Sequence, residues 1–132
     1  MSDLTLLVKD KMKDDRGFCF ANNYNVLYVE ENYCEMEAIM DKTSFNPFGI
    51  AHGGYIFGLA DTAAGIAAMT DGRVAVTIDS SIQYLKAGKG SKLKAVAKCI
   101  KNGKNVGFFE VYIYDQDDVL IAKSNINYFY MN

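Results

Sequence analysis

Asp61 is the only acid in a nearly apolar segment that runs from residue 54 to residue 69. Removing an ionised carboxylate from water is costly unless the carboxylate is paired or hydrogen-bonded. Acids kept in such surroundings are found disproportionately at functional sites. The sequence therefore predicts that Asp61 is a catalytic or ligand-binding group.

His52, Gly53 and Gly54 lie immediately before this segment, where a helix is expected to begin. The first N–H groups of a helix have no partner within the helix, and the helix dipole places partial positive charge there. Because glycine lets a ligand come close, this terminus is suited to hold an anion or to polarise a carbonyl oxygen. The alternative is a plain tight turn into the helix, which glycines also favour.

Helical spacing places three glycines and the acid on one stripe. At about 100° per residue, Gly58, Asp61 and Gly65 all fall within roughly 40° of Gly54. A stripe of small residues can also be a groove for close packing, but packing alone leaves the acid unexplained. We therefore favour a functional stripe.

The distance along the helix indicates a site shared between two copies of the chain. Seven residues separate Gly54 from Asp61, which is about 10 Å along one helix. A short aspartate side chain and the Gly54 N–H cannot both reach one carbonyl group across that distance. Two antiparallel helices related by a twofold axis bring the acid of one copy to the helix terminus of the other.

The remaining pattern predicts the elements that hold this segment. A short amphipathic helix is expected at about residues 3–16, and the apolar segment predicts a buried central helix from residue 54 or 55 to about 70. Partial alternation of apolar and polar residues, divided by turn signals such as Asn-Gly, predicts six strands. They are expected at residues 24–30, 33–41, 74–85, 92–100, 106–114 and 119–130.

Strands joined by short turns pair antiparallel, and one apolar helix needs a sheet curved around it. The sequence thus predicts an α+β fold. At 132 residues we expect one domain, 1–132, with its core at about 24–130; such a chain buries close to 70% of the surface of its unfolded form.

Composition excludes several classes of partner. The net charge of −2, with acids and bases mixed along the chain, disfavours binding to nucleic acid. No apolar run approaches the roughly 20 residues that span a bilayer, so no membrane partner is expected. The three cysteines, Cys19, Cys34 and Cys99, lack metal-ligand spacing, and the N-terminus lacks a signal-peptide pattern. We expect a cytoplasmic protein without a bound metal.

Several short motifs follow one another along the chain: Asn46-Pro47, His52-Gly53-Gly54, Leu59-Ala60-Asp61, Val76-Thr77-Ile78-Asp79 and Gln83-Tyr84-Leu85. Asn46 lies six residues before His52, and His52 lies nine residues before Asp61. Over about residues 24–130, this pattern resembles the hotdog-fold acyl-CoA thioesterases of the phenylacetate-pathway type. The resemblance implies a curved antiparallel sheet around a long helix, in dimers and often tetramers.

The resemblance also implies roles for individual residues. Asp61 would act as general base on water or as nucleophile on the thioester carbonyl, and the sequence leaves both open. Gly54, with Gly53 beside it, would donate backbone N–H to the thioester oxygen from the opposite subunit. Asn46 would orient the same carbonyl, and Thr77 would help Asp61 to hold the attacking water. We expect His52 to order the loop rather than to transfer protons.

The expected substrate is an acyl-CoA, with no further cofactor. Relatives commonly carry Arg-Pro-Ala after the Tyr-Leu pair, where this chain has Lys86-Ala87-Gly88, so the contacts to the CoA phosphates are open. Lys86, Lys89, Lys92 and Arg73 are candidates, although scattered basic residues are more often solvated surface.

Three functions remain to be weighed. We favour hydrolysis of small acyl- or aroyl-CoA thioesters. A hydratase or dehydratase on the same fold would use a catalytic histidine, and the only histidine here is His52. A non-catalytic acyl-CoA-binding protein would not need Asp61 and Asn46 facing the thioester.

Overall fold

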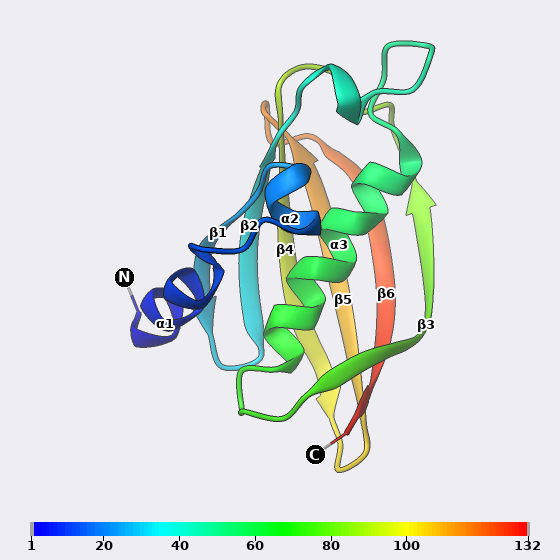
Figure 1. The fold of residues 1–132 in the computed structure, drawn as a ribbon. Helices are drawn as coiled ribbons and strands as arrows, with labels where there is room; N and C mark the ends of the chain where they lie inside the picture. Colours follow the sequence, from blue (N-terminus) through cyan, green and yellow to red (C-terminus); the bar gives the residue numbers. More distant parts are fainter. Residues whose placement is uncertain (1, 132) are drawn as a thin grey trace.

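The computed structural model describes residues 2–131. Six antiparallel strands form one curved sheet in the order β1-β2-β4-β5-β6-β3, and a long helix, α3, crosses its concave face (Figure 1). This is the α+β arrangement that the sequence predicted. The elements are α1 (Asp3–Met12), α2 (Phe18–Ala21), β1 (Tyr24–Glu30), β2 (Tyr33–Ile39), the 3-10 turn η1 (Lys42–Ser44), α3 (Gly53–Ala68), β3 (Ala75–Tyr84), β4 (Lys92–Asn102), β5 (Val106–Asp115) and β6 (Leu120–Tyr130).

Helix α3 buries one face against the sheet. Its small alanines let the strands approach closely, and the larger Leu59 and Ile56 fill the space between the layers. The outer face, which carries Gly58 and Asp61, is only partly buried. The prediction of a helix buried on all sides is therefore wrong for this face. Among residues 2–131, no helix is long and apolar enough to span a membrane.

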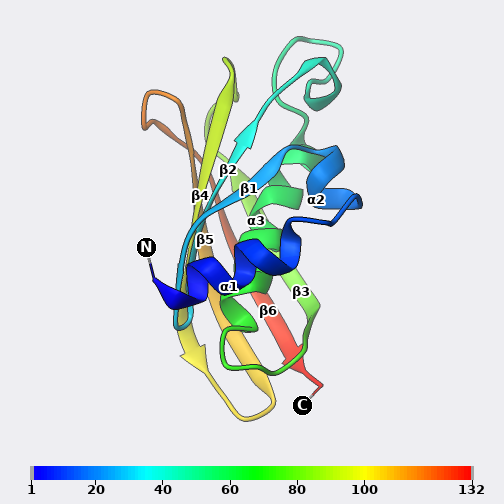
Figure 2. The same ribbon diagram turned by 60° about the vertical axis from the view of Figure 1, so that its left-hand side comes forward.

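The N-terminal helix is shorter than predicted. It ends at Met12 rather than near residue 16, because Asp14 and Asp15 follow it and acids are unfavourable at a helix C-terminus. Asp15 instead accepts the N–H of Gly17, which leads into α2, a short helix that the sequence did not predict. Figure 2 shows α1 and α2 on the same side of the sheet as α3.

The connection after α3 carries the chain to the far edge of the sheet. Strand β3 pairs only with β6 and forms this edge. Nearly all of its residues are exposed, and so are the apolar side chains within it and at its ends. These are Val74, Val76, Ile78, Tyr84 and Leu85, each 44–55% exposed.

One glycine of the stripe on α3 is required by packing. A Cβ atom at Gly58 would lie 2.6 Å from the hydroxyl oxygen of Tyr24 and 3.2 Å from the ring of Phe18. Tyr24 is buried and donates its O–H to the carbonyl of Tyr55 at 2.5 Å, so it cannot move aside without losing that hydrogen bond. The packing explanation thus holds for this position.

We predict that Gly58→Ala lowers the free energy of unfolding by about 1–2 kcal/mol, because overpacking outweighs the better helix propensity of alanine. Gly65→Ala is the matched control, because its Cβ would lie 3.7 Å from the nearest atom, the hydroxyl of Tyr128. It should leave stability unchanged or raise it by up to about 1 kcal/mol. Denaturant unfolding measures both, and equal effects of the two variants would contradict this account.

Candidate active site

Two hydroxyl groups from the sheet hold one oxygen of Asp61. The Oγ1 of Thr77, on β3, donates to Asp61 Oδ1 at 2.8 Å. The hydroxyl of Tyr128, on β6, lies 2.8 Å from the same Oδ1 and 2.8 Å from the backbone carbonyl oxygen of Asp61. No group of residues 2–131 donates a hydrogen bond to the other oxygen, Oδ2. One carboxylate oxygen is thus anchored, and the other accepts no hydrogen bond from the described residues.

A β-bulge in β3 aims Thr77 at the helix. Thr77 pairs with Tyr128, but Asp79 pairs with the next residue, Asn127, so one extra residue lies between them. Without the bulge, Thr77 and Asp79 would point to the same face of the sheet. Instead, Asp79 accepts a hydrogen bond from Asn127 Nδ2 at 2.7 Å on the opposite face. The bulge therefore keeps this second carboxylate away from Asp61.

Tyr128 is the site residue that the sequence analysis missed. It is one of several tyrosines in strand-like runs, and nothing in its neighbours distinguishes it. Its position opposite Thr77 depends on the strand register and on the bulge, which the apolar pattern of β3 does not reveal. Burial is the main cause that raises the pKa of the Tyr128 hydroxyl, and the nearby charge of Asp61 raises it further.

The N-terminus of α3 is capped by the only histidine of the chain. The His52 side chain accepts the N–H of Gly54 on Nδ1 at 2.8 Å. The N–H of Gly53 donates to no acceptor among the described residues. Tyr84, at the end of β3, donates its hydroxyl to the carbonyl of Gly53 at 2.8 Å. The predicted Gly54 donor is thus occupied by an exposed imidazole, which must turn aside before that N–H can bind a ligand.

Asn46 orders the loop that precedes the helix. Its Oδ1 accepts the N–H of Phe48 at 2.9 Å and that of Ile50 at 3.4 Å, which is the local bonding typical of asparagine in turns. The side-chain amide group donates to no acceptor within residues 2–131. Asn46 therefore uses its oxygen for the loop and keeps its N–H donors available.

A groove of about 380 Å³ brings together Asn46, Gly53 and Lys86, whereas His52 and Gly54 do not line it. Asn46 and Gly53 line it on one side, and the loop after β3, including Lys86, lines it on the other. Asp61 and Thr77 do not line this groove. One chain therefore presents two separate groups: the loop and helix N-terminus, and the Asp61–Thr77–Tyr128 cluster two turns further along the helix.

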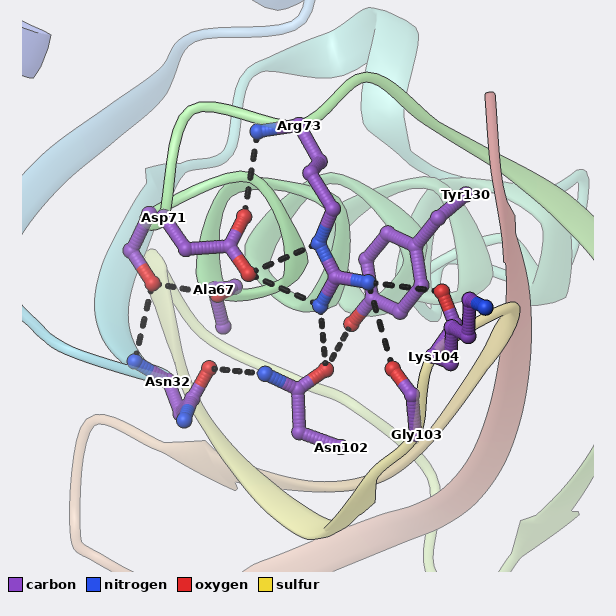
Figure 3. A network of polar contacts seen from close by, with 9 residues as sticks. Asn32, Ala67, Asp71, Arg73, Asn102, Gly103, Lys104 and Tyr130 are labelled. Atoms are coloured by element: carbon purple, nitrogen blue, oxygen red, sulfur yellow. Dashed lines mark hydrogen bonds and ion pairs between the residues drawn. The ribbon is translucent and has the colours of Figure 1, made fainter. Parts of the chain in front are cut away.

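The basic residues proposed for phosphate contact differ in availability. Arg73 donates to the carboxylate of Asp71, to the side chain of Asn102 and to the carbonyls of Gly103 and Lys104 (Figure 3). Its guanidinium also lies 3.5 Å from the ring centroid of Tyr130. The structure does not test Arg73 as a phosphate ligand, but its donors already hold the start of β3 against the β4–β5 turn.

The three candidate lysines are less engaged than Arg73. Lys92 lies 3.9 Å from a carboxylate oxygen of Glu37, which is a weak surface pair. Lys86 and Lys89 are exposed in the loop after β3 and form no ion pair within residues 2–131. These two remain available to an anionic ligand.

Comparison of the sequence with known proteins identifies its family. The sequence model of the thioesterase superfamily matches residues 48–122, which include α3, β3 and the loop with Lys86. This chain belongs to the thioesterase superfamily. A relative from Archaeoglobus fulgidus is named as a candidate esterase. It is 34% identical to this chain over 123 residues, which cover 92% of this chain and 79% of the relative. The acyl-coenzyme A thioesterase PaaI of Escherichia coli is 28% identical over 99 residues, 74% of this chain and 71% of that protein.

Solved structures share the hotdog fold of this thioesterase-superfamily member. The E. coli PaaI structure superposes with a TM-score of 0.92 at 23% identity, covering 99% of this chain and 96% of that one. A Streptococcus mutans protein bound to acetyl CoA gives a TM-score of 0.82 at 31% identity, covering 90% and 94%. A Streptococcus pneumoniae protein described as a hypothetical thioesterase and solved with coenzyme A gives 0.80 at 31% identity, covering 83% and 90%. That protein was also solved with an aspartate and, separately, a threonine replaced by alanine.

Proposed function

We propose that this chain hydrolyses small acyl- or aroyl-CoA thioesters to the free acid and CoA, in two equivalent sites that each combine residues of two copies. The observation that carries the proposal is the hydrogen bond from Thr77 to Asp61, two residues sixteen positions apart. The aspartate and threonine replaced in the S. pneumoniae thioesterase are also sixteen positions apart. The bound acetyl CoA and CoA in two relatives support the substrate class.

In the proposed mechanism, Asp61 acts through its open oxygen, Oδ2. As general base, it takes a proton from water while the water oxygen attacks the thioester carbon. Once the His52 imidazole of a second copy has turned aside, the N–H of that copy's Gly54, with Gly53 beside it, binds the carbonyl oxygen as negative charge develops there. The amide of Asn46 orients the same carbonyl. Collapse of the intermediate breaks the C–S bond, and the departing CoA thiolate takes the proton from Asp61, which restores the carboxylate.

The alternative chemistry uses Asp61 as nucleophile. Its Oδ2 attacks the carbonyl carbon, CoA thiolate leaves, and water then cleaves the resulting anhydride. A single turnover in ¹⁸O-labelled water with excess enzyme can separate the two routes. Label in the Asp61 carboxylate supports an anhydride that water cleaves at the Asp61 carbonyl, whereas label confined to the product acid fits direct attack by water as well as cleavage of the anhydride at its acyl carbon.

Several features of the structure support a shared site. The Asp61 group and the Gly54 terminus are about 10 Å apart along one helix, and the outer face of α3 is partly open. The unpaired edge of β3, with its exposed apolar side chains, offers a surface on which a second copy can pair. We propose a homodimer, with Lys86 and Lys89 near the CoA phosphates.

The test is release of free thiol from a panel of short-chain, branched and aromatic acyl-CoAs. Because Cys19 and Cys99 are only partly buried, a thiol-detecting reagent needs an enzyme-only control. Hydrolysis of at least one member at a rate proportional to enzyme supports the proposal. Tight CoA binding without hydrolysis of any member would favour the non-catalytic alternative, and hydration of an enoyl-CoA would favour the hydratase.

A further inference from the structure

Tyr128 occupies an unusual position for a core tyrosine. Its side chain is 2% exposed, and its ring packs edge-on against Phe109 with 5.8 Å between ring centroids. Its hydroxyl nevertheless lies within hydrogen-bond distance of two atoms of Asp61 on helix α3, Oδ1 and the backbone carbonyl oxygen. A rigid, buried ring thus places one donor at the carboxylate of a partly buried acid.

We propose that Tyr128 is a positioning residue for hydrolysis, which fixes Oδ1 of Asp61 so that Oδ2 faces the thioester. This inference rests on the proposed function of Asp61. The two donors to Oδ1 are complementary, because Thr77 comes from the exposed edge strand and Tyr128 from the interior. Thr77 can exchange its hydrogen bond with water, whereas the buried Tyr128 hydroxyl has both of its acceptors, Oδ1 and the backbone carbonyl oxygen, on Asp61 itself.

The protonation state of Tyr128 suits this role. Burial, followed by the charge of Asp61, raises the pKa of the phenol above its ordinary value, so the hydroxyl keeps its proton at neutral and mildly alkaline pH. A neutral phenol beside an ionised carboxylate is a charge-assisted donor, which is stronger than a bond between neutral groups. The donor is therefore present whenever Asp61 is ionised.

The fold offers a matched control two residues further along β6. Tyr130 is 4% exposed and donates its hydroxyl to Asn102 Oδ1 at 2.5 Å, within the Arg73 network and away from Asp61. Tyr128→Phe and Tyr130→Phe each remove one buried hydroxyl from the same strand. Both should lower stability by about 0.5–1.5 kcal/mol, so a difference in activity cannot come from stability alone.

We expect Tyr128→Phe to lower kcat by about 10- to 100-fold, because a misdirected catalytic group costs up to about that factor. KM should change by less than about threefold, since Tyr128 does not touch the substrate. Tyr130→Phe should stay within about twofold of the unsubstituted protein in both constants. Equal kcat for the two variants, with an active unsubstituted protein, would overturn the role of Tyr128 and leave the proposed function standing.

A second measurement does not depend on activity. In protein labelled with ¹³C at aspartate, the carboxyl resonance of Asp61, assigned by its loss in Asp61→Asn, should shift in Tyr128→Phe and stay in place in Tyr130→Phe. An unchanged resonance in Tyr128→Phe would overturn the inference even if no tested acyl-CoA is hydrolysed. Inactivity of the unsubstituted protein on the whole panel, with the resonance shift present, would instead count against the proposed function.

Discussion

Asp61→Asn should abolish most thioester hydrolysis, lowering kcat by about 10²- to 10⁴-fold, the range typical of general acid–base groups. An amide can neither take a proton from water nor attack a thioester carbon. The amide oxygen can still accept hydrogen bonds from Thr77 and Tyr128, which hold Oδ1 in the unsubstituted protein. The variant is therefore expected to keep its fold and its assembly.

Asp79→Asn is the control for this substitution. Asp79 lies on the same strand as Thr77, but the bulge turns it to the opposite face, where it bonds to Asn127. We expect its kcat to stay within about twofold, because exposed hydrogen bonds of this kind contribute little. Turnover by Asp61→Asn at the rate of Asp79→Asn would refute both proposed mechanisms.

Two inactive variants should restore activity to each other if the site is shared. Gly54→Pro removes the proposed N–H donor within the first turn of α3, where proline is tolerated. A heterodimer of Asp61→Asn with Gly54→Pro contains one site with both defects and one intact site. After random exchange of equal amounts, about a quarter of all sites are intact, so the mixture should reach about a quarter of the unsubstituted rate.

This recovery separates a shared site from a site within one chain. If Asp61 and Gly54 of the same chain formed the site, every site in the mixture would carry a defect and the rate would remain at that of the variants. Native mass spectrometry of the mixture shows whether heterodimers have formed. Heterodimers without recovered activity would contradict the shared site, as would full activity of a protein that sediments as a monomer.

The sequence was sufficient to predict most of the fold. The strands begin and end within two residues of their predicted positions, because their alternation and turn residues are local signals. The same signals failed near the N-terminus, where acids end α1 early and four residues form α2. The composition of α3 also led to the wrong prediction of a helix buried on all sides. In the sequence, an apolar residue on the outer face of a helix cannot be told from one that faces the sheet.

The sequence nominated candidate site residues where a single residue stands out or where the resemblance supplies a position. Asp61 is recognisable as the one acid in an apolar segment, and Gly53-Gly54 as the glycine pair before that segment. The motif that contains Thr77 pointed to a partner for Asp61. Tyr128, the cap formed by His52 and the engagement of Arg73 depend on contacts between residues far apart in the chain. Strand register, a bulge and loop geometry determine these contacts, and no periodic pattern encodes them.

The unpaired edge of β3 has a consequence beyond catalysis. A sheet edge with free backbone N–H and carbonyl groups and apolar side chains can add strands from any other chain, which is a common start of aggregation. In the proposed dimer, the twin strand of the second copy would cover this edge. Weakened pairing would then show itself first as poor solubility.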